Sequence, residues 1–455
     1  MVFALLVALG AALLARSSSP SILASLGAPG VYSGVLQDGS LYEFQLPTHW
    51  NGILFLYSHG YVVKGDLNPA VDAGDIYTGA WLLDHGYAVA GSSFASAGWD
   101  VAQAETDQKD LLLQFSAITG RSPSEVIAWG HSLGGLITVE LAQLYPNKIA
   151  GAVSFCGVVS GGAPIWNVDL AAMVAIKKLL GPKSKLQLVN ITHPSQNLAL
   201  AESLVNNAQK SPSGRARIAL VAAIDGIPGW YNPSSFQPNS VSAQERAQYQ
   251  WLTINDLPFF ADYRAELEKR AGGNFSTDVG FNFSTALLRS PSLSEVRQLY
   301  DQAGLRLTSD LNELSKIKPI YAGNGPSQYL ERYSAVSGKL SIPLLTMHTT
   351  GDGLVPDSTE SVLKQLVSSQ GDQSMLRQLT VSRAGHCTFS ASETIVALKA
   401  MLYRIHTGRW PNLSPSYLNS QADEFSSTYN KFTTVNGSFF TKPDFVKTQP
   451  PPFPM

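Results

Sequence analysis

Short apolar runs alternate with helix-like segments in the first third of the chain. Four apolar runs of strand length lie at 53–57, 87–90, 126–129 and 150–155. The segments 76–85 and 133–144 lie between these runs, and residues 133–144 carry apolar side chains at helical spacing. Strands that alternate with helices predict an α/β fold, with a mostly parallel sheet and helices on both faces.

A hairpin and a long interruption modify this pattern. Residues 31–46 contain two β-rich runs on either side of an Asp-Gly pair, which predicts an N-terminal antiparallel hairpin. From 161 to 338 the pattern is helical and rich in loops, and strand-like runs resume only at 342–347 and around 379–381. We interpret the chain as one sheet with a mainly helical insertion, since two separate domains would each leave an exposed sheet edge.

The predicted organisation therefore has five parts. They are an N-terminal segment at 1–28, a first core part at 29–160, the insertion at 161–338, a second core part at 339–406 and a tail at 407–455. The tail is mostly polar and ends in TQPPPFPM, a composition typical of a segment that wraps the surface or is disordered.

The first residues form an apolar run from Val2 to Ala15 that stops at Arg16. This run is too short to span a bilayer but has the length of the apolar region of a secretory signal. We therefore expect a signal peptide, a secreted or secretory-lumen protein and no stable membrane span; the alternative is a buried or frayed N-terminal helix. Five Asn-X-Ser/Thr sequons agree with secretion and predict a glycoprotein: Asn190, Asn274, Asn282, Asn412 and Asn436.

Composition narrows the possible partners. Charged residues make up 15% of the 455 residues, the net charge is −2 and no basic run is present, which argues against nucleic acid. The chain contains no HExxH, CxxC or P-loop motif, so we expect no metal and no nucleotide or other cofactor. The expected partner is a small-molecule or ester substrate, and the oligomeric state stays open. The chain has two cysteines, Cys156 and Cys387. Composition leaves open whether they are free thiols or form one disulfide bridge.

The motif Gly130-His131-Ser132-Leu133-Gly134 has the pattern G-x-S-x-G between a predicted strand and a predicted helix. In that context the serine lies on a sharp turn that projects its hydroxyl above the sheet. The helix N-terminus beneath it favours developing negative charge. We interpret Ser132 as a nucleophile; the alternative is an ordinary tight turn.

A nucleophilic hydroxyl needs a base and an acid that orients the base. In this architecture the acid and the histidine follow the serine in that order. We choose His386, which lies in a loop after a predicted strand; His193, His348 and His406 are the rejected histidines. We choose Asp352 as the acid because it directly follows a buried strand, where catalytic groups gather in open α/β sheets. Asp357 is the competitor and could instead cap the next helix.

An oxyanion site needs two backbone N–H groups directed at one point. The amide of Leu133, the residue after the nucleophile, is one candidate. The second is the amide of Tyr61, in the loop His59-Gly60-Tyr61 that follows the 53–57 run. We expect His59 to hold this loop rather than to transfer protons.

Together these segments resemble the α/β-hydrolase superfamily. The resemblance is carried by four motifs: HG-x after a strand, GHSLGG at the strand-to-helix turn (the elbow), GD-x-x-VP after a later strand and GH near the end. It covers roughly 30–160 and 340–405, and it implies that the insertion at 161–338 is a cap. The overall pattern is similar to secreted esterases, including the tannase and feruloyl-esterase type. Some of those join a cysteine beside the serine to one beside the histidine.

That resemblance bears on the two cysteines. Cys387 follows His386, but no cysteine adjoins Ser132; Cys156 instead ends the strand after the elbow helix. The resemblance implies a Cys156–Cys387 bridge that braces the histidine loop, and the different cysteine position departs from that subfamily.

Aromatic residues are candidates for the substrate pocket. Trp99 follows the 87–90 strand and opens onto the same sheet edge, so it could wall the pocket. The insertion supplies further candidates for a pocket roof: Trp166, Trp230, Tyr231 and Phe236. The alternative is that these residues pack in the core or on the surface.

These observations predict a secreted serine hydrolase that cleaves a carboxylic ester through an acyl-enzyme on Ser132. An amidase or peptidase is the nearest alternative because it shares the acyl-transfer step. A lyase or cyclising enzyme would use His386 as a base without an acyl-enzyme. A non-catalytic binding module on the same fold is the third alternative, and an intact triad weighs against it.

Overall fold

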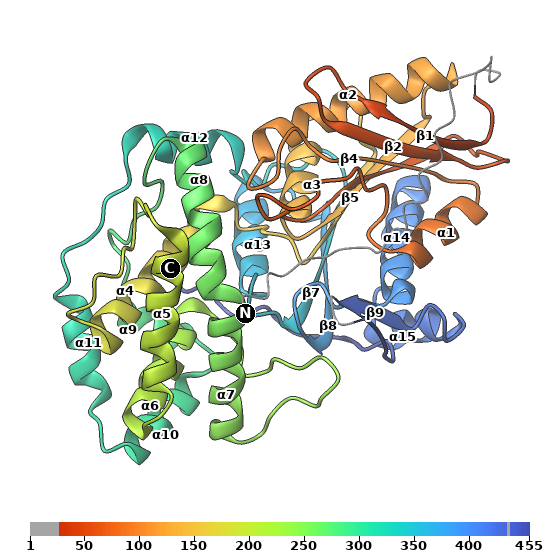
Figure 1. Ribbon diagram of the computed structural model, residues 1–455. Helices are drawn as coiled ribbons and strands as arrows, with labels where there is room; N and C mark the ends of the chain where they lie inside the picture. The colour runs from red at the N-terminus through yellow and green to blue at the C-terminus, as the bar shows by residue number, and fades with distance from the viewer. Residues whose placement is uncertain (1–26, 435–436) are drawn as a thin grey trace.

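The computed structural model describes residues 27–434 and 437–455, and its centre is a nine-stranded sheet (Figure 1). The strand order is β1-β2-β4-β3-β5-β6-β7-β8-β11. Six strands form the parallel part: β3 (Ile53–Ser58), β4 (Ala88–Ser92), β5 (Glu125–His131), β6 (Gly151–Phe155), β7 (Leu344–Gly351) and β8 (Leu376–Ala384). The hairpin of β1 (Gly30–Val35) and β2 (Leu41–Leu46) is antiparallel. The predicted mostly parallel sheet with an N-terminal hairpin is confirmed.

Helices cover both faces of this sheet, as the side chains of β3 show. Leu54 and Leu56 join the core under α2 (Val101–Thr119), α3 (Leu133–Leu144) and α13 (Thr359–Gln370). Phe55 and Tyr57 point to the other face, where α1 (Ile76–Asp84) and α14 (Ala391–Thr407) pack. Successive side chains of a strand alternate between faces, so a strand covered on both sides must be apolar throughout.

A helical unit is inserted between β6 and β7 and lies to one side of the sheet (Figure 1). It contains α4 (Gly162–Leu180), α5 (Pro194–Ala208), α6 (Pro212–Asp225), α7 (Val241–Trp251), the π-helical segments η1 (Leu252–Asp256) and η2 (Phe259–Tyr263), α8 (Arg264–Ala271), α9 (Phe283–Arg289), α10 (Leu293–Gln302), α11 (Leu307–Ser315) and α12 (Asn324–Tyr333). A separate hydrophobic core around Ile176, Val221 and Tyr300 holds these helices together. We call residues 161–338 the cap.

The tail is more regular than its polar composition suggests. It forms α15 (Pro415–Asp423), β9 (Lys431–Thr434), β10 (Gly437–Phe440) and β11 (Phe445–Val446), and β11 pairs antiparallel with β8. A buried ion pair between Arg383 and Glu393 anchors it, since Arg383 donates to the Lys442 carbonyl and Glu393 accepts from the Asp444 amide. Its end reaches the cap, where Arg289 donates to the backbone oxygens of Phe453 and Met455.

The structure bears on one of the two sequence features that suggested secretion, the glycosylation sequons, and does not describe the other, the apolar N-terminal run. The apolar run from Val2 to Ala15 lies outside the described residues, and no described helix is long and apolar enough to cross a membrane. Asn274 is buried, and its amide bonds to Ser276, Tyr321 and Arg264. A glycan on Asn274 therefore does not fit this fold, because its attachment nitrogen is enclosed.

Candidate active site

The turn between β5 and α3 forces Ser132 into an unusual backbone conformation, with φ 59° and ψ −122°. Positive φ is costly for a residue with a Cβ, and such strain occurs at functional sites. Gly130 and Gly134 permit the turn, because a Cβ on either would overlap the carbonyl oxygen of Ser58. The sequence thus folds into a sharp strand–turn–helix that exposes the serine hydroxyl at the carboxyl end of the sheet.

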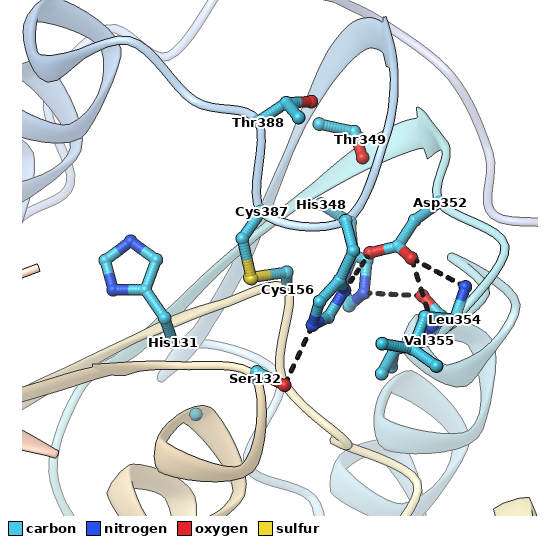
Figure 2. Close-up of a disulfide and its surroundings, with 12 residues drawn as sticks. His131, Ser132, Cys156, His348, Thr349, Asp352, Leu354, Val355, Cys387 and Thr388 are labelled. Carbon is cyan, nitrogen blue, oxygen red and sulfur yellow. Dashed lines mark hydrogen bonds and ion pairs between the residues drawn. A yellow bond between two sulfur atoms is a disulfide. The ribbon is translucent and has the colours of Figure 1, made fainter. Parts of the chain in front are cut away.

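The structure brings the three predicted side chains, Ser132, His386 and Asp352, into hydrogen-bond contact; Ser132 and Asp352 are labelled in Figure 2, where dashed lines mark their hydrogen bonds. The distance from His386 Nε2 to Ser132 Oγ is 2.8 Å, and the distance from His386 Nδ1 to Asp352 Oδ2 is 2.7 Å. The other oxygen of Asp352 accepts hydrogen bonds from the amides of Leu354 and Val355, each at 3.0 Å. Asp352 is 1% exposed. Three donors, the two amides and the imidazole Nδ1–H, therefore hold its carboxylate in one place without competition from water.

The rejected candidates lie elsewhere. The imidazole of His348 is buried between Glu360 Oε1, at 2.8 Å from Nδ1, and the Val355 carbonyl, at 3.2 Å from Nε2. His406 bonds to Glu125 on the surface. Asp357 is half-buried, and desolvation of its carboxyl group raises its pKa to about 7, with nearby His348 lowering it and Asp352 raising it. Asp352 rather than Asp357 reaches the imidazole of His386.

Two further histidines near the serine are held away from it. His131 is half-buried, stacks on Phe155 at 4.8 Å between ring centres, and its Nδ1 lies 3.2 Å from the Tyr57 hydroxyl. Burial and the nearby His386 lower the pKa of His131 to about 3. His59 stacks on Phe94 and bonds to the Gly60 carbonyl at 2.7 Å, and burial lowers its pKa as well. Both rings are therefore neutral and structural at pH 7, which leaves His386 as the imidazole at the hydroxyl.

A disulfide joins Cys156 to Cys387 beside the triad, as the resemblance implied (Figure 2). The two Cα atoms are 5.3 Å apart, within the ordinary disulfide range. Cys156 directly follows β6, whose Phe155 carbonyl accepts the Ser132 amide at 3.0 Å. Cys387 directly follows His386. The bridge therefore ties the strand that supports the serine to the loop that carries the imidazole.

The loop expected to supply an oxyanion donor lies against the nucleophile. A Cβ built on Gly60 would be 3.3 Å from the Ser132 Cβ, so a larger residue there would crowd the hydroxyl. Within the described chain, neither the Leu133 amide nor the Tyr61 amide donates a hydrogen bond to another residue. The ring of Tyr61 stacks on Tyr263 of the cap at 4.1 Å. The oxyanion role of the two amides stays a prediction.

The tryptophans proposed for the pocket are packed inside the protein. Trp99 is 2% exposed and donates to Ser334 Oγ at 2.9 Å. Trp166 is fully buried and stacks on Phe259 at 4.4 Å. Trp230 donates to the Ser235 carbonyl at 3.1 Å. Packing accounts for all three, and a substrate-binding role for them stays a prediction.

Residues 85–224 match the family described as Hydrolase_4, serine aminopeptidase, S33. The chain is 25% identical over 454 residues to a protein of Xanthobacter agilis named o-phthalyl amidase, covering 92% of this chain and 96% of that protein.

Among solved structures, the chain is similar to feruloyl esterase B from Aspergillus oryzae, with 14% identity, a TM-score of 0.39 and coverage of 84% of this chain and 80% of that one. A second similar structure is an esterase from Aspergillus oryzae, with 12% identity, a TM-score of 0.38 and coverage of 90% and 83%.

Proposed function

We propose that this chain, a hydrolase of the α/β-hydrolase fold, cleaves a carboxylic ester through an acyl-enzyme on Ser132. One observation carries the proposal. A serine on a strained strand-to-helix turn contacts an imidazole that in turn contacts a buried carboxylate, at 2.8 and 2.7 Å. This geometry serves nucleophilic acyl transfer, because it couples a hydroxyl to a base that is already oriented.

The reaction begins when Ser132 Oγ attacks the substrate carbonyl and His386 Nε2 takes the hydroxyl proton. Asp352 accepts the hydrogen bond from Nδ1–H and stabilises the imidazolium that forms. The amides of Leu133 and Tyr61 are our candidates for donors to the tetrahedral oxyanion. Collapse of the intermediate breaks the bond to the alcohol, which leaves with the proton from His386. Water activated by the same imidazole then attacks the acyl-enzyme and releases the acid and Ser132.

Amide hydrolysis is the second candidate, and one observation favours it. The Xanthobacter agilis protein named o-phthalyl amidase aligns over almost the whole of both chains. An amidase would use the same acyl-enzyme, but His386 must then protonate a poorer leaving group, the amine, before the bond breaks. Matched ester and anilide substrates of benzoic and phthalic acid distinguish the two candidates, because their acyl-enzymes are identical and only the leaving group differs.

Labelling and turnover test the proposal together. A fluorophosphonate probe should add to Ser132, and 4-nitrophenyl acetate or benzoate should be hydrolysed with one oxygen from labelled water entering the acid. Ser132→Ala should abolish both results, whereas Ser368→Ala, at an exposed serine of α13, should change neither. An unlabelled Ser132 would favour a binding module. Labelling without water incorporation into an acid would favour a lyase.

We also propose that the protein is secreted. A disulfide between Cys156 and Cys387 and the apolar run at 2–15 support an oxidising destination. Expression of the full chain in a eukaryotic host should place the protein in the medium, with its N-terminus beyond residue 15. Retention in the cytosol with an intact N-terminus would contradict the proposal.

A further inference from the structure

A second buried imidazole lies behind the acid of the triad. His348 belongs to β7, the strand that ends just before Asp352, and it is 1% exposed. Its Nδ1 is 2.8 Å from Oε1 of Glu360 on α13, and its Nε2 is 3.2 Å from the carbonyl oxygen of Val355. Both ring nitrogens are thus occupied away from Ser132, so this histidine takes no proton in the proposed reaction.

The partners of His348 show that its ring carries both protons. The Glu360 carboxylate acts as an acceptor on every side, since it also accepts from Thr346 Oγ1 at 2.6 Å and from Gln378 Nε2. The other partner of the ring is a carbonyl oxygen, which can only accept. Both ring nitrogens must therefore donate, and only the imidazolium form of histidine has two donors. The buried pair of His348 and Glu360 is an ion pair.

The surroundings of the ring favour this charge. Burial alone lowers the pKa of His348, but the hydrogen bond and the charge of Glu360 raise it, as do the charges of Asp352 and Asp357. The net result is a pKa above the ordinary value for histidine. A buried cation that is paired and hydrogen-bonded on both sides is held in one orientation, because any rotation of the ring would leave a charged donor without an acceptor.

Val355 connects this imidazolium to the triad. Its carbonyl accepts from His348, and its amide donates to Oδ1 of Asp352 at 3.0 Å; all three residues are labelled in Figure 2. Among the described residues, His348 supplies the one hydrogen bond to that carbonyl. A loop residue that is held at its carbonyl keeps its own amide in place. If the Val355 amide moved, the carboxylate could turn and its Oδ2 would leave His386 Nδ1, although the Leu354 amide would still hold Oδ1.

We propose that protonated His348 is a positioning residue: by donating to the Val355 carbonyl, it orients the amide that holds Asp352 against the catalytic imidazole. The inference rests on the proposed function, because it concerns the triad that would carry out the acyl transfer. The competing interpretation is that the ion pair of His348 and Glu360 only stabilises the packing of α13 on β7. The two interpretations differ in which of the two hydrogen bonds of the ring affects turnover.

Two amide variants separate the two bonds. The side-chain nitrogen of asparagine can take the place of Nδ1, and that of glutamine can take the place of Nε2. His348→Asn thus keeps the donor to Glu360 and loses the donor to Val355, whereas His348→Gln does the reverse. With 4-nitrophenyl acetate, we expect His348→Asn to lower kcat about tenfold at an unchanged KM, because a small displacement of reacting groups lowers the rate steeply.

The glutamine variant should keep kcat within about threefold of the wild-type value, since it restores the donor to Val355. Both variants should melt at a lower temperature, because each leaves a buried acceptor without its donor. His49→Asn, at an exposed histidine, should change neither kcat nor the melting temperature. A wild-type kcat in folded His348→Asn would overturn the proposal, as would an equal loss of kcat in the asparagine and glutamine variants.

A proton NMR spectrum separates this inference from the proposed function, because it needs no turnover. The Nδ1 proton of His386, which lies between the imidazole and Asp352, should give a far-downfield signal that is assigned by its absence in His386→Ala. That signal should shift or broaden in His348→Asn and persist in His348→Gln. An unmoved signal in folded His348→Asn would overturn the positioning role even if esters are hydrolysed. The expected shift without any ester hydrolysis would support the positioning role and refute the esterase.

Discussion

Removal of the Cys156–Cys387 bridge should impair catalysis more than substrate binding. Both cysteines have positive φ, 45° and 57°, a conformation that persists only when its surroundings enforce it. When the bridge is lost, we expect the backbone at 387 to relax and to carry the neighbouring His386 away from Ser132. A displacement of about 1 Å at reacting groups costs about 100-fold in rate. The Cys156→Ala/Cys387→Ala variant should therefore lose about 100-fold in kcat, with KM within about threefold.

The same change has a stability component that can be measured separately. The bridge closes a sequence separation of 231 residues, for which loop-closure entropy gives about 5 kcal/mol. With an unfolding entropy of about 2.1 cal/mol/K per residue, the melting temperature should fall by about 5 °C. Assays carried out well below the measured transition of the variant report geometry rather than unfolding.

Steady-state kinetics and thermal melts, with and without reductant, provide the assay. Reductant should lower kcat of the wild-type protein toward that of the double alanine variant and should leave that variant unchanged. If the variant melts about 5 °C lower yet keeps its kcat within twofold, the bridge stabilises the fold without positioning His386, and the reasoning is refuted.

Three further predictions follow from the geometry. Asp352→Asn should lower kcat by about 10⁴-fold at an unchanged melting temperature, and retained activity would exclude the acid role. Gly134→Ala should destabilise the protein by more than about 2 kcal/mol in denaturant unfolding, because its methyl overlaps the Ser58 carbonyl; an unchanged midpoint would contradict this. Burial raises the pKa of six carboxyl groups to about 7: Glu105, Asp107, Asp225, Glu245, Glu295 and Asp357. Between the pKa values that these carboxyl groups have in the unfolded chain and about pH 7, the folded state therefore binds more protons than the unfolded state. The melting temperature should fall from pH 5 to pH 8, and a rise would refute the assignment.

The sequence predicted the parts of the molecule whose signals are local. The run at 53–57 is apolar because β3 is covered on both faces, and the glycines around Ser132 reflect overlap with the neighbouring strand. Asp352 and His386 were identifiable because each follows a strand of the same sheet, and parallel strands end at the same edge.

Other features depend on contacts between distant segments, which periodicity does not record. Asp169, Asp225 and Asp256 are spread over the cap sequence, and only tertiary packing places them around one cavity. The π-helical segments η1 and η2 have no sequence signature distinct from that of an α-helix. The strand β11 is only two residues long, too short for alternation to predict it, and its position follows from the buried Arg383–Glu393 pair that receives the tail.

The short strand β11 also has a consequence for the behaviour of the protein in solution. Without it, β8 would be the outermost strand, and the backbone groups of Thr380 and Val381 would be open to pairing with another molecule. A chain shortened before Asp444 would thus expose a template for stacking between copies, so that solubility at high concentration depends on a few residues near the carboxyl terminus.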